Sequence, residues 1–268
     1  MITSRRVSLN GGPLDQVDER IVIQAIEESA GKDSITAVSR GFGNGQRVTG
    51  RRRDYLDVTV RFGILAKYDE MAAREEVLEA ANTWAAKGGS LTVDHKPDRR
   101  IRKAELVSAP GAGNIRNWTA EFAMVLRAYG IPYWEAKTPA TWIGAAAGSG
   151  GTGTYLEVPG NTETDADMLI ENMSGQRVEY VNIRAGSSIM SFSDLALAAG
   201  EALAIDHDDD GILRIRIRNA AKTGYRSAML NRSPGSADDL TVKPGNIYFS
   251  MSAQRACRPT VTVRGRWL

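Results

Sequence analysis

Two stretches of the sequence alternate strictly between apolar and polar positions. The first runs from Tyr55 to Ile64, and its apolar side chains recur at every second residue: Leu56, Val58, Val60, Phe62 and Ile64. The second repeats the pattern with Trp118, Ala120, Phe122, Met124, Leu126 and Ala128. A period of two places successive side chains on opposite faces of a strand. Both stretches are therefore predicted to be β-strands with one buried face.

A helix is predicted between these strands, from Asp69 to Ala86. Asp69 is a favourable N-cap residue, and Gly88-Gly89 ends the helix because glycine adopts the left-handed conformation at little cost. The apolar residues in between follow helical spacing and form one stripe: Val77, Leu78, Ala81, Trp84 and Ala85. Two half-buried strands and one amphipathic helix describe a small α+β unit in which no catalytic centre is visible.

A hairpin turn is predicted further upstream, at Asn44-Gly45, because both residues tolerate positive φ. The β-like run Ser34–Val38 precedes this turn, and the strand over Leu56–Ile64 is predicted to be its return arm. The backbone edges of such strands are natural places for pairing with another chain.

The composition changes between Thr138 and Ala166, where a small-residue, glycine-rich run offers little to pack. Beyond it, short β-like runs without helical periodicity predict a sandwich: Met168–Ile170, Val178–Ile183, Ser188–Phe192, Ala202–Ile205, Ile212–Ile217, Asn246–Met251 and Thr260–Val263. We therefore expect a mainly β protein with one helix. An N-terminal α+β domain over residues 1–137 is followed by a Gly/Ala-rich connection over 138–166 and a C-terminal β-sandwich over 167–268.

The charges nearly balance, with 34 Lys and Arg against 32 Asp and Glu, so the chain is no polycation built for nucleic acid. The basic runs Arg51–Arg53 and Arg99–Lys103 are expected to be solvated strand ends and edges. Cys257 is the one cysteine, which excludes a disulfide within the chain, and two histidines are too few for a structural zinc cluster. No apolar segment follows the first residues, so we expect a reducing, soluble compartment.

Three segments match known site motifs, and each is explained better without a ligand. Gly148–Gly153 fits G-x-G-x-x-G, but the residues after it are a poor start for a helix. Asp206–Gly211 resembles half of a calcium loop, yet Ile217 stands where a bidentate carboxylate is needed, so a hairpin turn is expected. Asp94-His95 has no nucleophile in a recognisable context. We expect no catalytic, cofactor-binding or metal-binding residues.

Taken in order, these elements resemble the distal tail protein (Dit) family of long non-contractile-tailed phages. The first half resembles that family's N-terminal ring domain in the order of its segments: Tyr55–Ile64, Asp69–Ala86, Ser90–Val93, Arg100–Val107, Trp118–Ala128 and Gly130–Trp134. In the second half, Gly200–Asp206 and Pro244–Ile247 resemble two of the family's strand motifs, although Asn246 follows Gly245 directly. The segment over 138–166 is longer than the family pattern.

The resemblance implies a structural virion protein and no enzyme: a hexameric hub at the tail tip with a galectin-like second domain. It joins the tail tube protein to the tail-associated hub protein, and receptor-binding or fibre proteins attach at its periphery. Assembly takes place in the bacterial host cytoplasm, without cofactor or membrane insertion. DNA only passes through the lumen, so Arg51–Arg53 and Arg99–Lys103 are expected to lie away from it or to pair with carboxylates.

The alternative function is a carbohydrate-binding module that attaches to host surface glycans through an exposed aromatic platform. The available rings are not spaced to guarantee a shared face: Tyr155, Tyr180, Tyr225, Tyr248 and Trp267. A second candidate surface consists of Arg214, Arg216 and Arg218, which alternate with apolar residues and are expected on one exposed face, solvated or meeting an acidic partner. A hydrolase is the weakest candidate.

Overall fold

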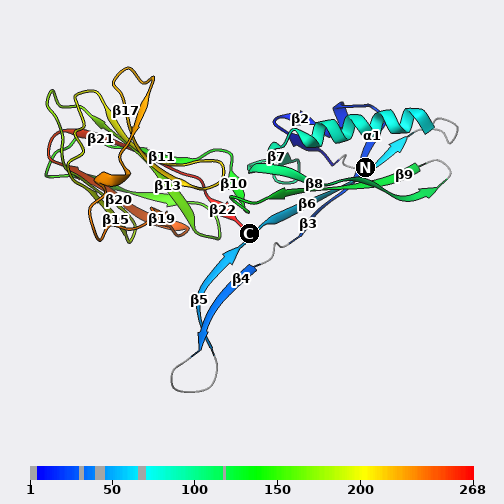
Figure 1. Ribbon diagram of the computed structural model, residues 1–268, viewed down its shortest axis with the longest axis horizontal. Helices are drawn as coiled ribbons and strands as arrows, with labels where there is room; N and C mark the ends of the chain where they lie inside the picture. The colour runs from blue at the N-terminus through cyan, green and yellow to red at the C-terminus, as the bar shows by residue number, and fades with distance from the viewer. Residues whose placement is uncertain (1–4, 30–32, 40–45, 66–70, 117–118) are drawn as a thin grey trace. The chain divides into compact units, whose positions relative to one another are not determined.

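The computed structural model describes residues 5–29, 33–39, 46–65, 71–116 and 119–268, with the backbone alone at 33, 36, 38–39, 46–52, 71, 111–116 and 119–120. The chain divides into two compact units, Met1–Trp134 and Glu135–Leu268 (Figure 1). No helix in the described part of the chain has the length and apolar character of a membrane span.

The first unit is built around one antiparallel sheet with the strand order β2-β1-β7-β8-β9-β6-β3. Its strands are β1 (Val7–Leu9), β2 (Gly12–Pro13), β3 (Ile21–Ser29), β6 (Leu56–Leu65), β7 (Gly89–Val93), β8 (Arg99–Arg116) and β9 (Thr119–Ala128). The two alternating stretches of the sequence are neighbours in this sheet, because β6 pairs with β9 over its full length. Phe62 and Phe122 lie opposite each other in that pair, with ring centroids 5.7 Å apart. Both strand predictions are confirmed, and Trp118 lies outside the described residues.

The predicted helix is also present, as α1 (Met71–Ala86), and it contacts β8 along the sheet (Figure 1). Its apolar stripe is largely buried, with Val77, Ala81 and Ala85 fully inaccessible and Leu78 half-buried. Trp84 is 5% exposed, and its Nε1 donates a hydrogen bond to the Gly12 carbonyl at 2.8 Å. The helix ends where Gly88 takes a φ of +57°, a conformation that glycine adopts without strain.

The hairpin prediction is half wrong. β4 (Asp33–Ser39) contains the expected first arm, but its return arm is β5 (Gln46–Arg53) and not the strand over Leu56–Ile64. The predicted turn at Asn44-Gly45 lies outside the described residues. The physical reason is length: a turn at this position leaves room for a complete second arm before β6 begins. β6 instead pairs with β3 and β9.

The second unit is a β-sandwich. One sheet has the order β11-β21-β13-β16-β17-β18, with β19 beside β13, and the other has the order β12-β20-β14-β15. Its strands are β11 (Ala140–Ile143), β12 (Thr152–Val158), β13 (Thr164–Asn172), β14 (Val181–Ala185), β15 (Ser188–Phe192), β16 (Ala202–His207), β17 (Leu213–Arg218), β18 (Tyr225–Ser227), β19 (Thr241–Val242), β20 (Gly245–Ala253), β21 (Cys257–Val263) and β22 (Arg266–Trp267). β10 (Trp134–Ala136) spans the boundary between the two units.

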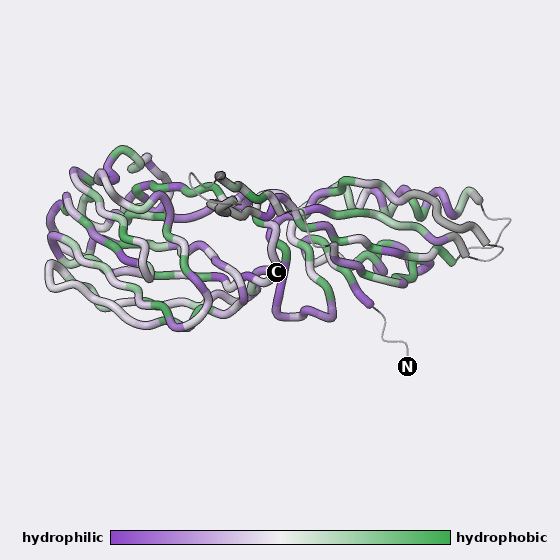
Figure 2. The backbone as a smooth tube through the Cα atoms, turned by 90° about the horizontal axis from the view of Figure 1, so that it is seen from below, coloured by the Kyte–Doolittle hydropathy of each residue, from purple (hydrophilic) through white to green (hydrophobic). Residues whose placement is uncertain are grey.

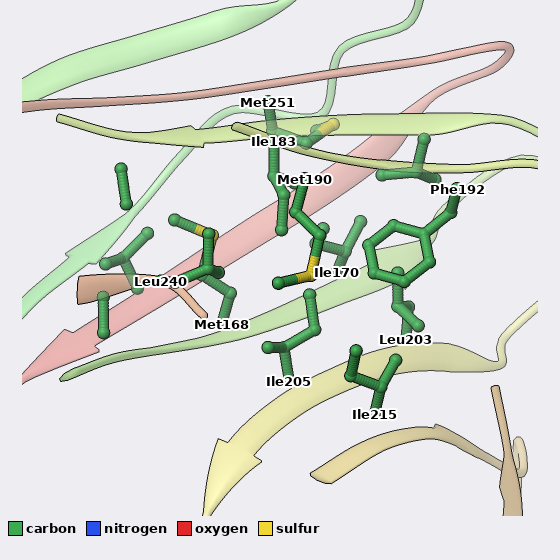
Figure 3. Close-up of a cluster of buried hydrophobic side chains, with 14 of the residues drawn as sticks. Met168, Ile170, Ile183, Met190, Phe192, Leu203, Ile205, Ile215, Leu240 and Met251 are labelled. Atoms are coloured by element: carbon green, nitrogen blue, oxygen red, sulfur yellow. The ribbon is translucent and has the colours of Figure 1, made fainter. Parts of the chain in front are cut away.

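The core of the second unit lies between its two sheets. Met168, Ile170 and Ile205 of one sheet and Ile183, Met190, Phe192 and Met251 of the other are at most 3% exposed (Figure 3). β13 and β14 alternate between buried and more accessible positions, whereas β16 is buried at five of its six positions. Figure 2 shows hydrophobic and hydrophilic residues interspersed along the tube. Cys257 is buried in the same core, which raises the pKa of its thiol to about 11.

The range over 138–166, expected to be a connection, contributes strands to the second unit. β11 pairs with β21, and β12 pairs with β20 over seven residues. Within the glycine-rich run, Ala147 forms a bridge with Cys257, and the Gly151 amide donates to the Gly148 carbonyl in a turn. A glycine-rich composition therefore marks tight turns between edge strands here, and the boundary of the two units lies at Trp134–Glu135.

Candidate functional site

The imidazole of His207, at the end of β16, is buried in the second unit between two carboxylates. Its side chain is 1% exposed, and its Nδ1 and Nε2 lie 2.9 Å from Asp167 Oδ1 and 2.8 Å from Asp239 Oδ1. Burial by itself lowers the pKa of His207, but the hydrogen bonds to the two carboxylates outweigh it and raise the pKa to about 10. The ring is therefore an imidazolium that donates both of its protons.

A buried arginine lies beside this group. Arg266 of β22 is 9% exposed in its side chain, and its Nε lies 3.2 Å from Oε1 of the fully buried Glu135. Its Nη2 forms a second ion pair, with Asp165 Oδ2 at 2.5 Å. Buried ion pairs cost desolvation and are retained only when their hydrogen bonds are satisfied, so this cluster fixes local geometry more than it adds stability.

The oxygen and nitrogen atoms of Asp165, His207 and Asp239 lie close enough to hold a metal ion, within 4.8 Å of one another. Each of them is already engaged: Asp165 pairs with Arg266, and the imidazole donates to Asp167 and Asp239. These contacts account for the cluster as a network of ion pairs. The absence of a metal site stays a prediction.

The acidic segment after His207 forms the expected turn between β16 and β17. Asp208 Oδ1 accepts hydrogen bonds from the backbone amides of Ile212 and Asp210, at 2.9 and 3.0 Å. These bonds, that from Ile212 foremost, hold the pKa of Asp208 below its usual range. This carboxylate therefore closes a turn. Likewise, the G-x-G-x-x-G match at Gly148–Gly153 runs into strand β12 and no helix.

Asp94-His95 lies at the surface of the first unit, with the His95 side chain 45% exposed. The better organised group nearby is Glu28, which accepts hydrogen bonds from Lys96 Nζ at 2.5 Å and from Trp134 Nε1 at 2.9 Å. Burial raises the pKa of Glu28, but these two donors outweigh it and leave the pKa below its ordinary value. Sequence reasoning missed this contact because its partners are separated by 106 residues.

The arginines of β17 alternate with the buried Ile215 and Ile217, as expected, and pair with acidic neighbours. Arg214 and Arg216 both bond Asp206, at 3.0 and 2.5 Å, and Arg218 reaches Glu171. The positive charge of this face is thus largely compensated within the sheet.

The two basic runs differ in what the structure shows of them. In Arg51–Arg53, only the Arg53 side chain is described, and its guanidinium lies 5.8 Å from the centroid of the Tyr133 ring. In Arg99–Lys103, the end residues pair with carboxylates: Arg99 with Asp98 at 3.6 Å and Lys103 with Glu105 at 3.3 Å. Both pairs have at least one exposed partner, so each is of small energetic value.

The β4–β5 hairpin is the strongest candidate for an assembly site. It forms a sheet of two strands, neither of which pairs with another described strand. Both outer backbone edges are thus open to another chain, and Ile35 on β4 is 58% exposed. The hairpin is drawn in Figure 1 as a separate ribbon carrying the labels β4 and β5.

Two of the five candidate aromatic residues are in contact in the structure. Tyr155 of β12 lies opposite Tyr248 of β20, and the ring centroids are 5.1 Å apart with the planes tilted by 53°. Tyr225 lies instead on β18 of the other sheet, where Arg216 packs over its ring. Because the tyrosine pair is separated by 93 positions in the chain, only knowledge of the β12–β20 register could have revealed it.

No protein-family model matches the sequence, and no curated protein matches it either. Among solved structures, the chain is similar to the crystal structure of the SPP1 Dit (gp 19.1) protein, with a TM-score of 0.68 and 14% identity over 98% of this chain and 99% of that chain. A chain of the phage P2 baseplate in its activated conformation with calcium gives a TM-score of 0.48 and 8% identity over 97% of this chain and 98% of that one. The same baseplate with strontium gives 0.47 and 8%, over 97% of each chain.

The similarity to SPP1 Dit spans both units. It confirms the mainly β fold class with one helix that the sequence predicted. The chain therefore has the fold of the SPP1 Dit protein over nearly its whole length.

Proposed function

We propose that this chain is a structural virion protein of a phage tail tip, a distal tail protein that forms a hexameric hub. The hub joins the tail tube protein to a tail-associated hub protein and carries receptor-binding or fibre proteins. It is assembled in the bacterial host cytoplasm and has no enzymatic activity. Phage DNA is in contact with it only during transit through the lumen.

The observation that carries this proposal is the fold shared with SPP1 Dit over 98% of the chain. That protein is described as a paradigm of the hub adsorption apparatus in phages that infect Gram-positive bacteria. The order of elements in the sequence supports the same family, because the resemblance rests on residues in both units.

The β4–β5 hairpin supports a ring on physical grounds. A two-stranded hairpin alone is at best marginally stable in water, and β4 and β5 pair only with each other among the described strands. Its open edges and the exposed Ile35 would be covered by a neighbouring subunit. Contacts of this kind join unlike surfaces head to tail, and they end in a closed ring only when the rotation between subunits closes.

Light scattering on the purified chain tests the ring. We expect a mass six times 29.1 kDa, or a concentration-dependent shift toward it, and open rings in particle images. The substitution Ile35→Asp places a charge on the proposed contact and is expected to release folded monomers.

Ile143→Asp is the matched control, since Ile143 is 65% exposed on β11 of the second unit. This variant should assemble like the unmodified chain. A chain that remains monomeric at high concentration and in the presence of tail neighbours contradicts the hub. If the Ile35→Asp variant forms the ring equally well, the hub proposal stands but the hairpin is not part of the ring interface.

A further inference from the structure

A groove of about 430 Å³ lies on the outer face of the sheet β12-β20-β14-β15. Its floor follows one row of cross-strand neighbours, because Gly153 lies opposite Ser250, Ser250 opposite Arg184, and Arg184 opposite Ile189. The next row supplies Ser252 and Asn182, which also lie opposite each other. All of these residues line the groove.

One wall of the groove is aromatic. Tyr248 lines it, is 36% exposed, and is in contact with Tyr155, which is 65% exposed. The Tyr248 side chain lies over Gly153, so a Cβ at that position would meet the Tyr248 hydroxyl oxygen at 2.5 Å. Only glycine leaves room for the ring there. The tyrosine is thereby held beside the groove, with a flat apolar face and a polar end.

The floor of the groove carries one charge. Arg184 is the only charged residue among those that line the groove. Its Nε donates to the Gly186 carbonyl at 2.8 Å, and no described carboxylate forms an ion pair with it. This backbone contact orients the guanidinium, and its terminal nitrogens can bind a carboxylate in two parallel hydrogen bonds.

An amide and two hydroxyl groups complete the lining. Asn182 Oδ1 accepts a hydrogen bond from Ser191 Oγ at 3.0 Å, which orients the amide and leaves its Nδ2 donors available to a ligand. Ser250 and Ser252 add hydroxyl groups that act as donors or acceptors. A polyhydroxylated ligand satisfies all of these groups at once.

We propose that this groove binds a short acidic oligosaccharide: a sugar ring packs on Tyr248, a carboxylate pairs with Arg184, and hydroxyl groups bond Asn182, Ser250 and Ser252. The inference does not rest on the hub, since every residue involved belongs to the second unit.

The surroundings set the orientation of this ligand. A second groove of about 500 Å³ shares Ser252 with the first and is lined by Glu179 and Asp194. Glu179 pairs with Arg177 at 3.4 Å, so the Asp194 carboxylate is the charge that disfavours a second anionic group there. The acidic ring therefore occupies the Arg184 end, and any continuation of the sugar chain past Ser252 is neutral.

Calorimetric titration of the full chain with trisaccharides tests the proposal. The probes are the trisaccharides of mannuronic, galacturonic and glucuronic acid, each beside its neutral mannose, galactose or glucose counterpart. We expect at least one acidic trisaccharide to bind with a dissociation constant of about 1 mM or tighter, and its neutral counterpart to bind at least roughly tenfold more weakly. Saturation-transfer NMR should show the sugar C–H protons close to an aromatic ring.

Tyr248→Ala and Arg184→Gln should each weaken binding by roughly tenfold or more, with thermal denaturation used to verify that each variant is folded. Tyr225→Ala and Arg214→Gln, on the other sheet, are the matched controls and should bind normally. The proposal is overturned if no acidic trisaccharide binds, if binding survives both groove substitutions, or if a neutral trisaccharide binds equally well. Equal affinity for a tri-aspartate peptide also overturns it, because the groove would then recognise charge without sugar.

Discussion

Replacing His207 by glutamine tests whether the charged imidazole contributes stability through its two aspartates. Glutamine has a similar length but no charge, and it cannot donate along both directions that Asp167 and Asp239 now occupy. The substitution therefore leaves at least one carboxylate without its ionic partner. We expect a lower free energy of unfolding at neutral pH and a changed dependence of stability on pH.

The magnitude follows from the pKa of His207, which rises from 6.5 to about 10 on folding. A group whose pKa is raised in the folded state contributes stability that is complete below its unfolded pKa and is lost as the pH rises through the folded one. Between about pH 6 and about pH 8.5 this amounts to a loss of about 2.5 kcal/mol. This pH range stays above the acid region. In the acid region the lowered pKa of Asp239 has its own effect, because the stability it provides is lost as the pH falls.

Urea unfolding across that range is the assay, and it stops short of the region where Cys257 contributes. The buried thiol has a pKa of about 11, against 9.0 in the unfolded chain, so it destabilises the fold as the pH rises above about 9. His95→Gln is the matched control, because His95 is the other histidine and is largely exposed. The unmodified chain and His95→Gln should lose stability with rising pH, whereas His207→Gln should not. Parallel curves for all three proteins refute the reasoning.

Three further predictions concern the core of the first unit, the boundary of the second unit and the absence of a metal. Phe62→Ala should destabilise the first unit by about 3–5 kcal/mol in urea unfolding, because the ring is fully buried against Phe122; a loss below about 1 kcal/mol contradicts that packing. We propose that the units fold independently, so a fragment over 135–268 should melt cooperatively, while one over 138–268 lacks Glu135 and should lose about 1–3 kcal/mol because the buried ion pair of Arg266 with Glu135 is missing. Equal stability of the two fragments contradicts the role of Glu135. A chelator should leave the melting temperature unchanged, and stoichiometric calcium or zinc in elemental analysis would show the metal prediction to be wrong.

Local sequence patterns were sufficient to predict a helix or strand where one of its faces is buried. The alternation at Leu56–Ile64 and the helical stripe ending at Ala85 each show which face of the element is buried. Both elements were therefore predictable to within a few residues. The turn at Asp208 was predictable for a different reason. An aspartate between two strands accepts hydrogen bonds from nearby backbone amides, and a glycine there adopts turn conformations easily.

Contacts between distant strands were not predictable in this way. The hairpin partner of β4 could not be chosen from alternation alone, because β5 and β6 follow each other closely and either can close a hairpin. The tyrosine pair depends on the β12–β20 register. The partners of His207 lie 40 and 32 positions away, and the one local signal was a pair of carboxylates, Asp165 and Asp167, spaced to share a strand face.

The ion pair between Glu135 and Arg266 has a consequence for the order of events on the ribosome. Its two residues are 131 positions apart, at opposite ends of the second unit. At the usual speed of translation, on the order of ten seconds pass between their synthesis. During that interval Glu135 stays hydrated, and the sandwich cannot close around it. The first unit, which ends at Trp134, is therefore synthesised on the order of ten seconds before the second unit can close, and it has this interval in which to fold.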